Sequence, residues 1–406
     1  MRKRQDKSAL FLAQTITAIG DSQTDLKAGY GVAAYNMWTA QLSKRLNTLG
    51  CSTKPRCFGV SGNTTSEMLG RAGLLFLYDT PAIGIIYGGV NDAFVTHSGT
   101  ATGGTASTIT LQNTASGTLG AYLNCTITIT SGAGAGQSRT ITAYNGAIIS
   151  GANYVASVDT PWVTLPTSTS VYSIGLPPAA ATQAHLQALS KVLKYGVRGD
   201  EQGRFVHVYS QADLPAKGNI GQRYVVLKDS SATGGVQGSL PGQNATIAGN
   251  YSASPKQSVW EYRNPQAGEL GWSRIAIDGT APFADGVQKV VIVSTNYQNW
   301  SSGGDNYNTS TSTGTQYAQY IPIRSAAKAA ALADAVVYCD LYDFQSKLIF
   351  GGTFSGLTLS SEAVQGSATF HYIDNNQHHG DYGHDTVARA ILQTITAQGW
   401  LTSLQS

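Results

Sequence analysis

Polar residues of the kinds used in nucleophilic catalysis follow three apolar segments near the start of the chain. Gly20-Asp21-Ser22 comes directly after the first segment, Gly62 follows the second and Asn91 follows the third. A serine hydroxyl is a weak nucleophile that needs a base for its proton and donors for the oxyanion that forms. A glycine N–H and an asparagine amide are suitable donors. Each motif alone is also consistent with an ordinary turn.

A cluster of acidic, amide and imidazole side chains lies near the end of the chain. A histidine there can accept the serine proton, and an aspartate can hold its tautomer. A polar surface loop explains one histidine easily but explains three histidines and two aspartates less well. The candidate bases are His378, His379 and His384, and their candidate partners are Asp374, Asn375 and Asp381.

Alternating strand and helix patterns place these motifs on a sheet. Strands are predicted at 15–19, 56–60, 82–87, 287–293 and 335–340. Helices are predicted at 33–49, 66–77, 178–196, 321–333 and 386–400 from the spacing of apolar residues. The strand at 82–87 is almost wholly apolar, as a central parallel strand should be. The alternation predicts a three-layer α/β fold with a parallel sheet.

Two β-rich stretches interrupt this pattern and read as inserted modules. Residues 99–177 are rich in Thr, Ser and Gly with period-two alternation, and 205–279 form a second such module. The core then comprises 10–98, a helix-bearing segment at 178–204, and 280–406. We expect both modules to leave the core at the carboxyl ends of strands, where the ligand sites of open α/β sheets lie.

Composition narrows the class of protein. The chain has 406 residues, of which 42% are hydrophobic and 12% charged, with 46 glycines and a net charge of +3. No long basic run suggests nucleic-acid binding, and no segment reads as a transmembrane helix. No CxxC pair occurs, so no disulfide is expected, and Cys125 and Cys339 read as buried thiols. The other two cysteines are Cys51 and Cys57.

The ordered blocks resemble those of SGNH (GDSL-type) hydrolases. The blocks are Gly20-Asp21-Ser22, Gly62-Asn63, Gly89-Val90-Asn91-Asp92 and the Asp/His cluster that includes Gly383-His384. The resemblance implies a flavodoxin-like α/β/α core with Ser22 as the nucleophile. It implies an oxyanion hole made by the Ser22 N–H, the Gly62 N–H and the Asn91 side chain. Neither a metal ion nor a cofactor is needed for this chemistry.

The last block departs from the family spacing. A histidine five residues before Gly383 is His378, but the residue three before it is Asn375 and not an aspartate. We therefore take His378 as the base and Asp374 as its partner, which requires a one-residue insertion. His379 remains an alternative base, and the Asp381/His384 pair is a weaker one. If Asn375 occupies the aspartate position, the site is a Ser–His dyad.

The inserted modules contain short sequence segments similar to those of phage tail fibres and tailspikes. These segments lie at 128–146, 212–216, 260–263 and 270–273. This resemblance implies a virion-tail or extracellular protein, as a homotrimer or with other tail proteins, that acts on a bacterial surface glycan. The candidate substrate contacts are Asp21, Tyr297 and Trp300, whereas the insert tryptophans read as module core.

The predicted function is therefore removal of O-acetyl groups from a capsule or O-antigen. Two alternatives stay open. One is an esterase or lipase that acts on another acyl ester. The other is a non-catalytic glycan-binding adhesin with a degenerate site.

Overall fold

The computed structural model describes most of the chain. The described residues are 13–25, 33–147, 153–175, 177, 179–199, 205–231, 256–263, 271–295, 315–350, 379 and 381–405. None of the helices in this part of the chain combines the length and the apolar character needed to cross a membrane.

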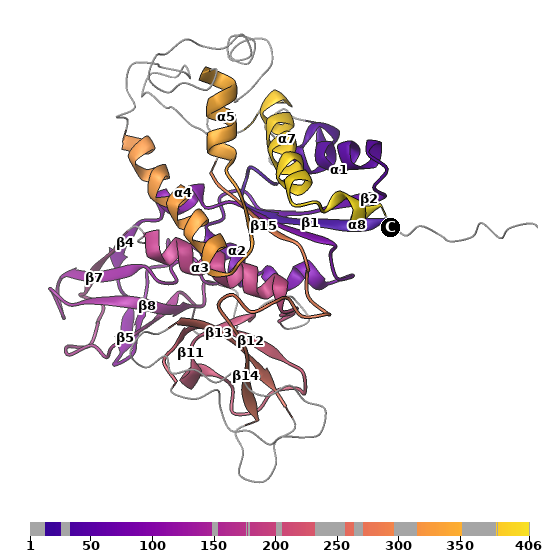
Figure 1. Ribbon diagram of the computed structural model, residues 1–406. Helices are drawn as coiled ribbons and strands as arrows, with labels where there is room; N and C mark the ends of the chain where they lie inside the picture. Colours follow the sequence, from indigo (N-terminus) through magenta and orange to yellow (C-terminus); the bar gives the residue numbers. More distant parts are fainter. Residues whose placement is uncertain are drawn as a thin grey trace, which may run out of the picture.

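A five-stranded parallel sheet forms the centre of the molecule, as predicted (Figure 1). Its strand order is β16-β15-β3-β1-β2. The strands are β1 (Gln14–Gly20), β2 (Thr53–Gly59), β3 (Ile83–Tyr87), β15 (Val290–Val293) and β16 (Val337–Cys339). Every residue of β3 and β15 is buried, because helices cover both faces of a parallel sheet.

Alternate residues of the strands pack into two separate hydrophobic cores, one on each face of the sheet. Ile83 and Ile85 pack with α1 (Trp38–Thr48) and α7 (Asp381–Ala397), whereas Ile86 faces the second core. The helices of that second face are α2 (Thr65–Gly70), α3 (Ala179–Lys194) and α4 (Thr315–Ala333). Two further helices are α5 (Leu341–Phe350) and α8 (Leu401–Leu404). The core is thus a three-layer α/β/α structure.

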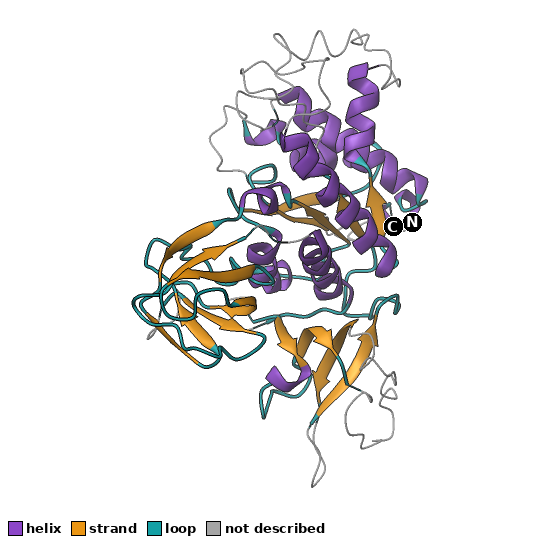
Figure 2. Ribbon diagram, turned by 90° about the vertical axis from the view of Figure 1, so that its left-hand side faces the viewer, coloured by secondary structure: helices purple, strands orange, loops and turns teal. Residues whose placement is uncertain are grey.

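A seven-stranded sheet follows the third strand of the core. We call it the first β module. Its order is β4-β10-β7-β8-β9-β6-β5. The strands are β4 (His97–Thr100), β5 (Gly103–Thr105), β6 (Thr108–Thr110), β7 (Thr126–Ser131), β8 (Ser138–Tyr144), β9 (Val155–Val158) and β10 (Val171–Ile174). It starts just after the Asn91 turn and lies beside α2 and α3 (Figures 1 and 2).

A four-stranded sheet, the second β module, follows α3. Its strands are β11 (His207–Ser210), β12 (Arg223–Asp229), β13 (Lys256–Tyr262) and β14 (Trp272–Ile277). Trp260 and Trp272 are buried in its core, as predicted for the insert tryptophans.

The expected departure point of the second β module was wrong. The module joins the end of α3 to the start of β15, which is the amino-terminal edge of the sheet. The Phe283 N–H bonds to the Lys194 carbonyl, and the Lys289 carbonyl accepts from Gly84 near the start of β3. Helix α3 has carried the chain away from the carboxyl edge, so only the first β module lies near the ends of the strands.

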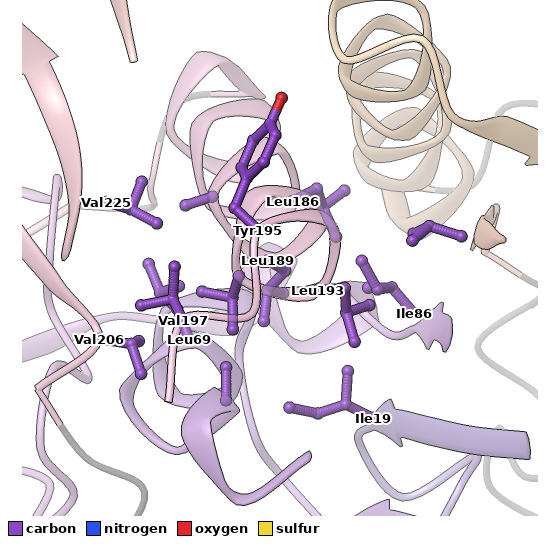
Figure 3. Packing of buried hydrophobic residues seen from close by; sticks show 14 of the residues in the cluster. Ile19, Leu69, Ile86, Leu186, Leu189, Leu193, Tyr195, Val197, Val206 and Val225 are labelled. Carbon is purple, nitrogen blue, oxygen red and sulfur yellow. The ribbon is translucent and has the colours of Figure 1, made fainter. Parts of the chain in front are cut away.

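Helix α3 packs against both the central sheet and the second β module. Figure 3 shows Leu186 and Leu193 of α3 among Ile19 and Ile86 of the sheet, with Val225 of the module nearby. The polar side of α3 is fixed by a buried ion cluster. The Lys191 ammonium lies 2.5 Å from Asp334 and 2.7 Å from Asp278, which directly follows β14.

Local differences from the expected elements have physical causes. The predicted helix at 66–77 is two short helices, α2 and a 3-10 turn at Ala72–Phe76, which are separated at Arg71, where φ is −122°. The Arg71 side chain is used for tertiary contacts described below. Cys125 and Cys339 are buried thiols, and none of the four cysteines, which all lie in the described residues, forms a disulfide.

Candidate active site

Ser22 lies on a tight turn at the carboxyl end of β1. The turn is closed by backbone bonds from Thr24 and Asp25 to the Asp21 carbonyl, both 3.0 Å long. A side chain at Gly20 would lie 2.2 Å from the Tyr87 carbonyl, so only glycine allows the turn to sit so close to β3. Ser22 is 7% exposed, so a small part of the residue is open to a substrate while the turn beneath it is held by hydrogen bonds.

Asp21 lies beneath this turn. Its carboxylate is fully buried and accepts a 3.0 Å hydrogen bond from the Gln23 N–H. Burial is the main reason that the pKa of Asp21 is raised from 3.8 to about 7, against backbone hydrogen bonds that lower it. The expected substrate contact does not suit this position, because a fully buried carboxylate supports the turn and has no surface to offer a ligand.

The loop after β2 brings Gly62 to the same edge of the sheet. Gly62 has φ +79°, a left-handed conformation that favours glycine. A side-chain carbon at this position would meet nothing within 4 Å. The peptide of Gly62 therefore borders open space, as a backbone donor to a substrate must.

Asn91 lies on the 3-10 turn Val90–Phe94 that follows β3. Its amide nitrogen donates a 3.0 Å hydrogen bond to the Asn63 carbonyl, next to Gly62. Because β1 lies between β3 and β2, this bond crosses the end of β1 beside Ser22. An amide nitrogen carries two N–H groups, so the bond to Asn63 leaves a second donor for an oxyanion.

Arg71 joins the end of β1 to β2 and to the loop that follows β2, and it was not identified from the sequence. Its guanidinium donates to the Gly20 carbonyl at 2.8 Å, to the Phe58 carbonyl at 2.6 Å and to the Asn63 side-chain oxygen at 2.7 Å. Burial lowers the pKa of Arg71 to about 10, so the group stays charged at neutral pH. The available signal was a lone basic residue within the apolar run 68–77.

Asp92 supports the Asn91 turn. Its carboxylate accepts from the Thr65 N–H at 2.8 Å, from the Thr65 hydroxyl, and from the Thr182 hydroxyl of α3 at 2.8 Å. Burial raises the pKa of Asp92 to about 6, although these hydrogen bonds oppose the rise. Asp92 is therefore mainly ionised at neutral pH, and it fixes the turn to two helices.

The late histidine cluster reaches the same edge through His379. The His379 Nε2 atom lies 2.9 Å from the hydroxyl of Tyr87, the last residue of β3. His379 is fully buried, and its ring centroid is 5.5 Å from that of the buried His384 in α7. Tyr87 is also buried, which raises its pKa well above 10 and keeps it protonated. His379 therefore lies between the end of β3 and His384 of α7, next to the strand that carries the Ser22 turn.

Several predicted site residues lie outside the described residues. These are His378, Asp374, Asn375, Tyr297 and Trp300. The structure places Ser22, Gly62 and Asn91 at the carboxyl edge of the sheet, and His379 lies against Tyr87 at the end of β3. In the described part of the chain, no group of three or more His, Cys, Asp or Glu side chains could hold a metal ion.

Some solved structures similar to this chain are esterases. No protein-family model matches the chain, and no curated protein sequence matches it. A lipase/acylhydrolase from Enterococcus faecalis is 11% identical over 95% of this chain and 96% of its own, with a TM-score of 0.38. An acetylxylan esterase from Geobacillus stearothermophilus is 10% identical over 94% of each chain, with a TM-score of 0.40. AlinE4, an SGNH-hydrolase family esterase, is 32% identical over 20% of this chain and 43% of its own, with a TM-score of 0.19.

Proposed function

We propose that this chain is a serine esterase of the SGNH type that removes O-acetyl groups from a bacterial surface polysaccharide. The observation that carries the proposal is the Asn91–Asn63 hydrogen bond across the end of β1. It gathers a serine, a glycine N–H and an amide donor, each from a different strand end. Acyl transfer needs this combination of groups.

The proposed reaction combines these groups with His378 and Asp374, the base and its partner predicted from the sequence. The Ser22 hydroxyl attacks the acetyl carbonyl while His378 accepts its proton, and Asp374 holds the imidazole. The negative charge on the former carbonyl oxygen is stabilised by the N–H groups of Ser22 and Gly62 and by the Asn91 amide. The sugar alcohol leaves with the proton. Water then hydrolyses the acetyl-serine through the same steps.

The polysaccharide substrate is supported by the surroundings of the site. The first β module begins six residues after Asn91, at His97, so it flanks the carboxyl edge where a polymer would lie. Its segment at 128–146 resembles phage tail proteins, which favours a virion tail as the location and a trimer or other tail proteins as partners. Tyr297 and Trp300 remain the proposed sugar contacts, since aromatic faces suit sugar rings.

Hydrolysis of para-nitrophenyl acetate, butyrate and octanoate by wild type and Ser22→Ala tests the chemistry. We expect acetate to be preferred and turnover to fall by at least about a thousandfold in Ser22→Ala. Ser138→Ala, at an exposed position of β8, is the matched control and should behave as wild type.

Release of acetate from purified capsule or O-antigen then tests the substrate. An octanoate preference would favour an esterase for another acyl ester. Capsule binding that is retained in Ser22→Ala, without turnover of any ester by wild type, would overturn the proposal in favour of an adhesin.

A further inference from the structure

A series of buried and partly buried hydrogen bonds runs from the first β module to the Asn91 turn. It starts at Asn124, whose side-chain nitrogen lies 2.9 Å from His185 Nε2 on α3. The other ring nitrogen, Nδ1, lies 3.0 Å from the Thr65 hydroxyl on α2. Thr65 in turn binds Asp92 through both its hydroxyl and its N–H. Asp92 directly follows Asn91, so the series ends at the proposed oxyanion donor.

Only one arrangement of protons satisfies this series. Burial lowers the pKa of His185 to about 3, helped by the nearby His207, so the imidazole is neutral. The ionised Asp92 carboxylate can only accept, so the Thr65 hydroxyl donates to it. Thr65 must then accept from His185 Nδ1–H, which leaves the Nε2 lone pair to accept from the Asn124 amide.

Asn124, the first residue of this hydrogen-bond series, belongs to a segment that packs firmly against the core. The Ser66 hydroxyl of α2 donates to the Ala121 carbonyl at 3.3 Å, and Leu123 lies in the core shared by α2 and α3. A side chain at Gly70 would lie 3.1 Å from the Leu119 carbonyl. Asn124 itself has φ 61°, a conformation that asparagine tolerates. The segment 119–124 is therefore packed against α2.

We propose that His185, held by Asn124 of the first β module, is a positioning residue for the Asn91 oxyanion donor. The His185 Nδ1–H orients the Thr65 hydroxyl toward Asp92, and Asp92 fixes the turn on which Asn91 lies. The inserted module thereby becomes part of the catalytic support. The inference rests on the proposed esterase function.

Two substitutions at His185 distinguish the role of Nδ1 from that of Nε2. An asparagine places its amide nitrogen near the position of Nδ1 and keeps the donation to Thr65, whereas a glutamine reaches the position of Nε2 and loses it. We expect His185→Gln to lower kcat on para-nitrophenyl acetate about tenfold with little change in KM, the effect of one misdirected hydrogen bond. His185→Asn should stay within about threefold of wild type.

Amide hydrogen exchange at Thr65 provides a readout that needs no substrate. The Thr65 N–H is bonded to Asp92, so its exchange should accelerate about tenfold in His185→Gln but not in His185→Asn. His97→Gln removes a partly buried histidine of β4, and it should change neither readout.

Equal effects of Gln and Asn at His185, or an equal effect of His97→Gln, would overturn the proposal. If wild type hydrolyses no ester, the esterase function fails, while exchange at Thr65 still decides whether His185 positions the turn.

Discussion

Replacing Arg71 by methionine tests whether one guanidinium holds the loops after β1 and β2 in the arrangement that the proposed active site needs. Methionine keeps an unbranched apolar stem but removes all three donors. These donors bind the Gly20 carbonyl behind Ser22, the Phe58 carbonyl of β2, and the Asn63 side chain. We expect both the stability of the fold and the rate of turnover to fall.

The expected loss of stability follows from the three hydrogen bonds. A hydrogen bond from a charged donor contributes about 1.5–3 kcal/mol net of desolvation, so three contribute about 5–9 kcal/mol. Burial lowers the pKa of Arg71 to about 10, so the guanidinium stays charged and keeps these bonds at neutral pH. The loss in Arg71→Met should therefore be about 5 kcal/mol or more in the free energy of unfolding.

Urea denaturation and turnover of para-nitrophenyl acetate measure the two effects. Because a displacement of about 1 Å at a catalytic group costs about a hundredfold in rate, kcat should fall by that order in Arg71→Met. Arg56→Met is the control, since its ion pair with Asp79 is partly exposed and contributes at most about 1 kcal/mol. The reasoning fails if Arg71→Met matches Arg56→Met in both assays.

Two further substitutions test the neighbours of Ser22. Tyr87→Phe removes the hydroxyl bonded to His379 but keeps the ring that packs on Trp38, so kcat should fall about tenfold with a nearly unchanged urea midpoint; an unchanged kcat would contradict a contribution of this bond to the site. Asp21 has a folded-state pKa of about 7 against 3.8 when unfolded, so its contribution to stability is present below pH 3.8 and is lost as pH rises through 7. Asp21→Asn should flatten this part of the stability–pH curve in urea titrations, and an unaltered slope would disprove it.

The strands and loops that carry the proposed nucleophile and the proposed oxyanion donors were predictable. Wholly buried parallel strands read as continuous apolar runs, as at Ile83–Tyr87. The positions that follow such runs meet at one edge, because all the strands point the same way. Those two regularities are local, so they place Ser22, Gly62 and Asn91 together without knowledge of tertiary contacts.

The supports of the site were not predictable in the same way. Arg71 contacts groups up to 51 positions away, and His185 bonds to Thr65 across 120 positions. The spacing of apolar residues along the sequence carries no information about such long-range hydrogen-bonded pairs. The position of the second β module depends on the direction in which α3 carries the chain, and helix α5 was missed between β16 and the late histidine cluster.

Helix α3 limits how this chain can be divided. It contributes Thr182 and His185 to the support of the Asn91 turn, Leu193 to the central core, and Lys191 to an ion cluster that includes the residue following β14. A module whose contacts with the core run through a shared helix cannot be moved to another protein without that helix. Transfer of either module onto another scaffold would therefore have to include residues 179–194 to keep these contacts.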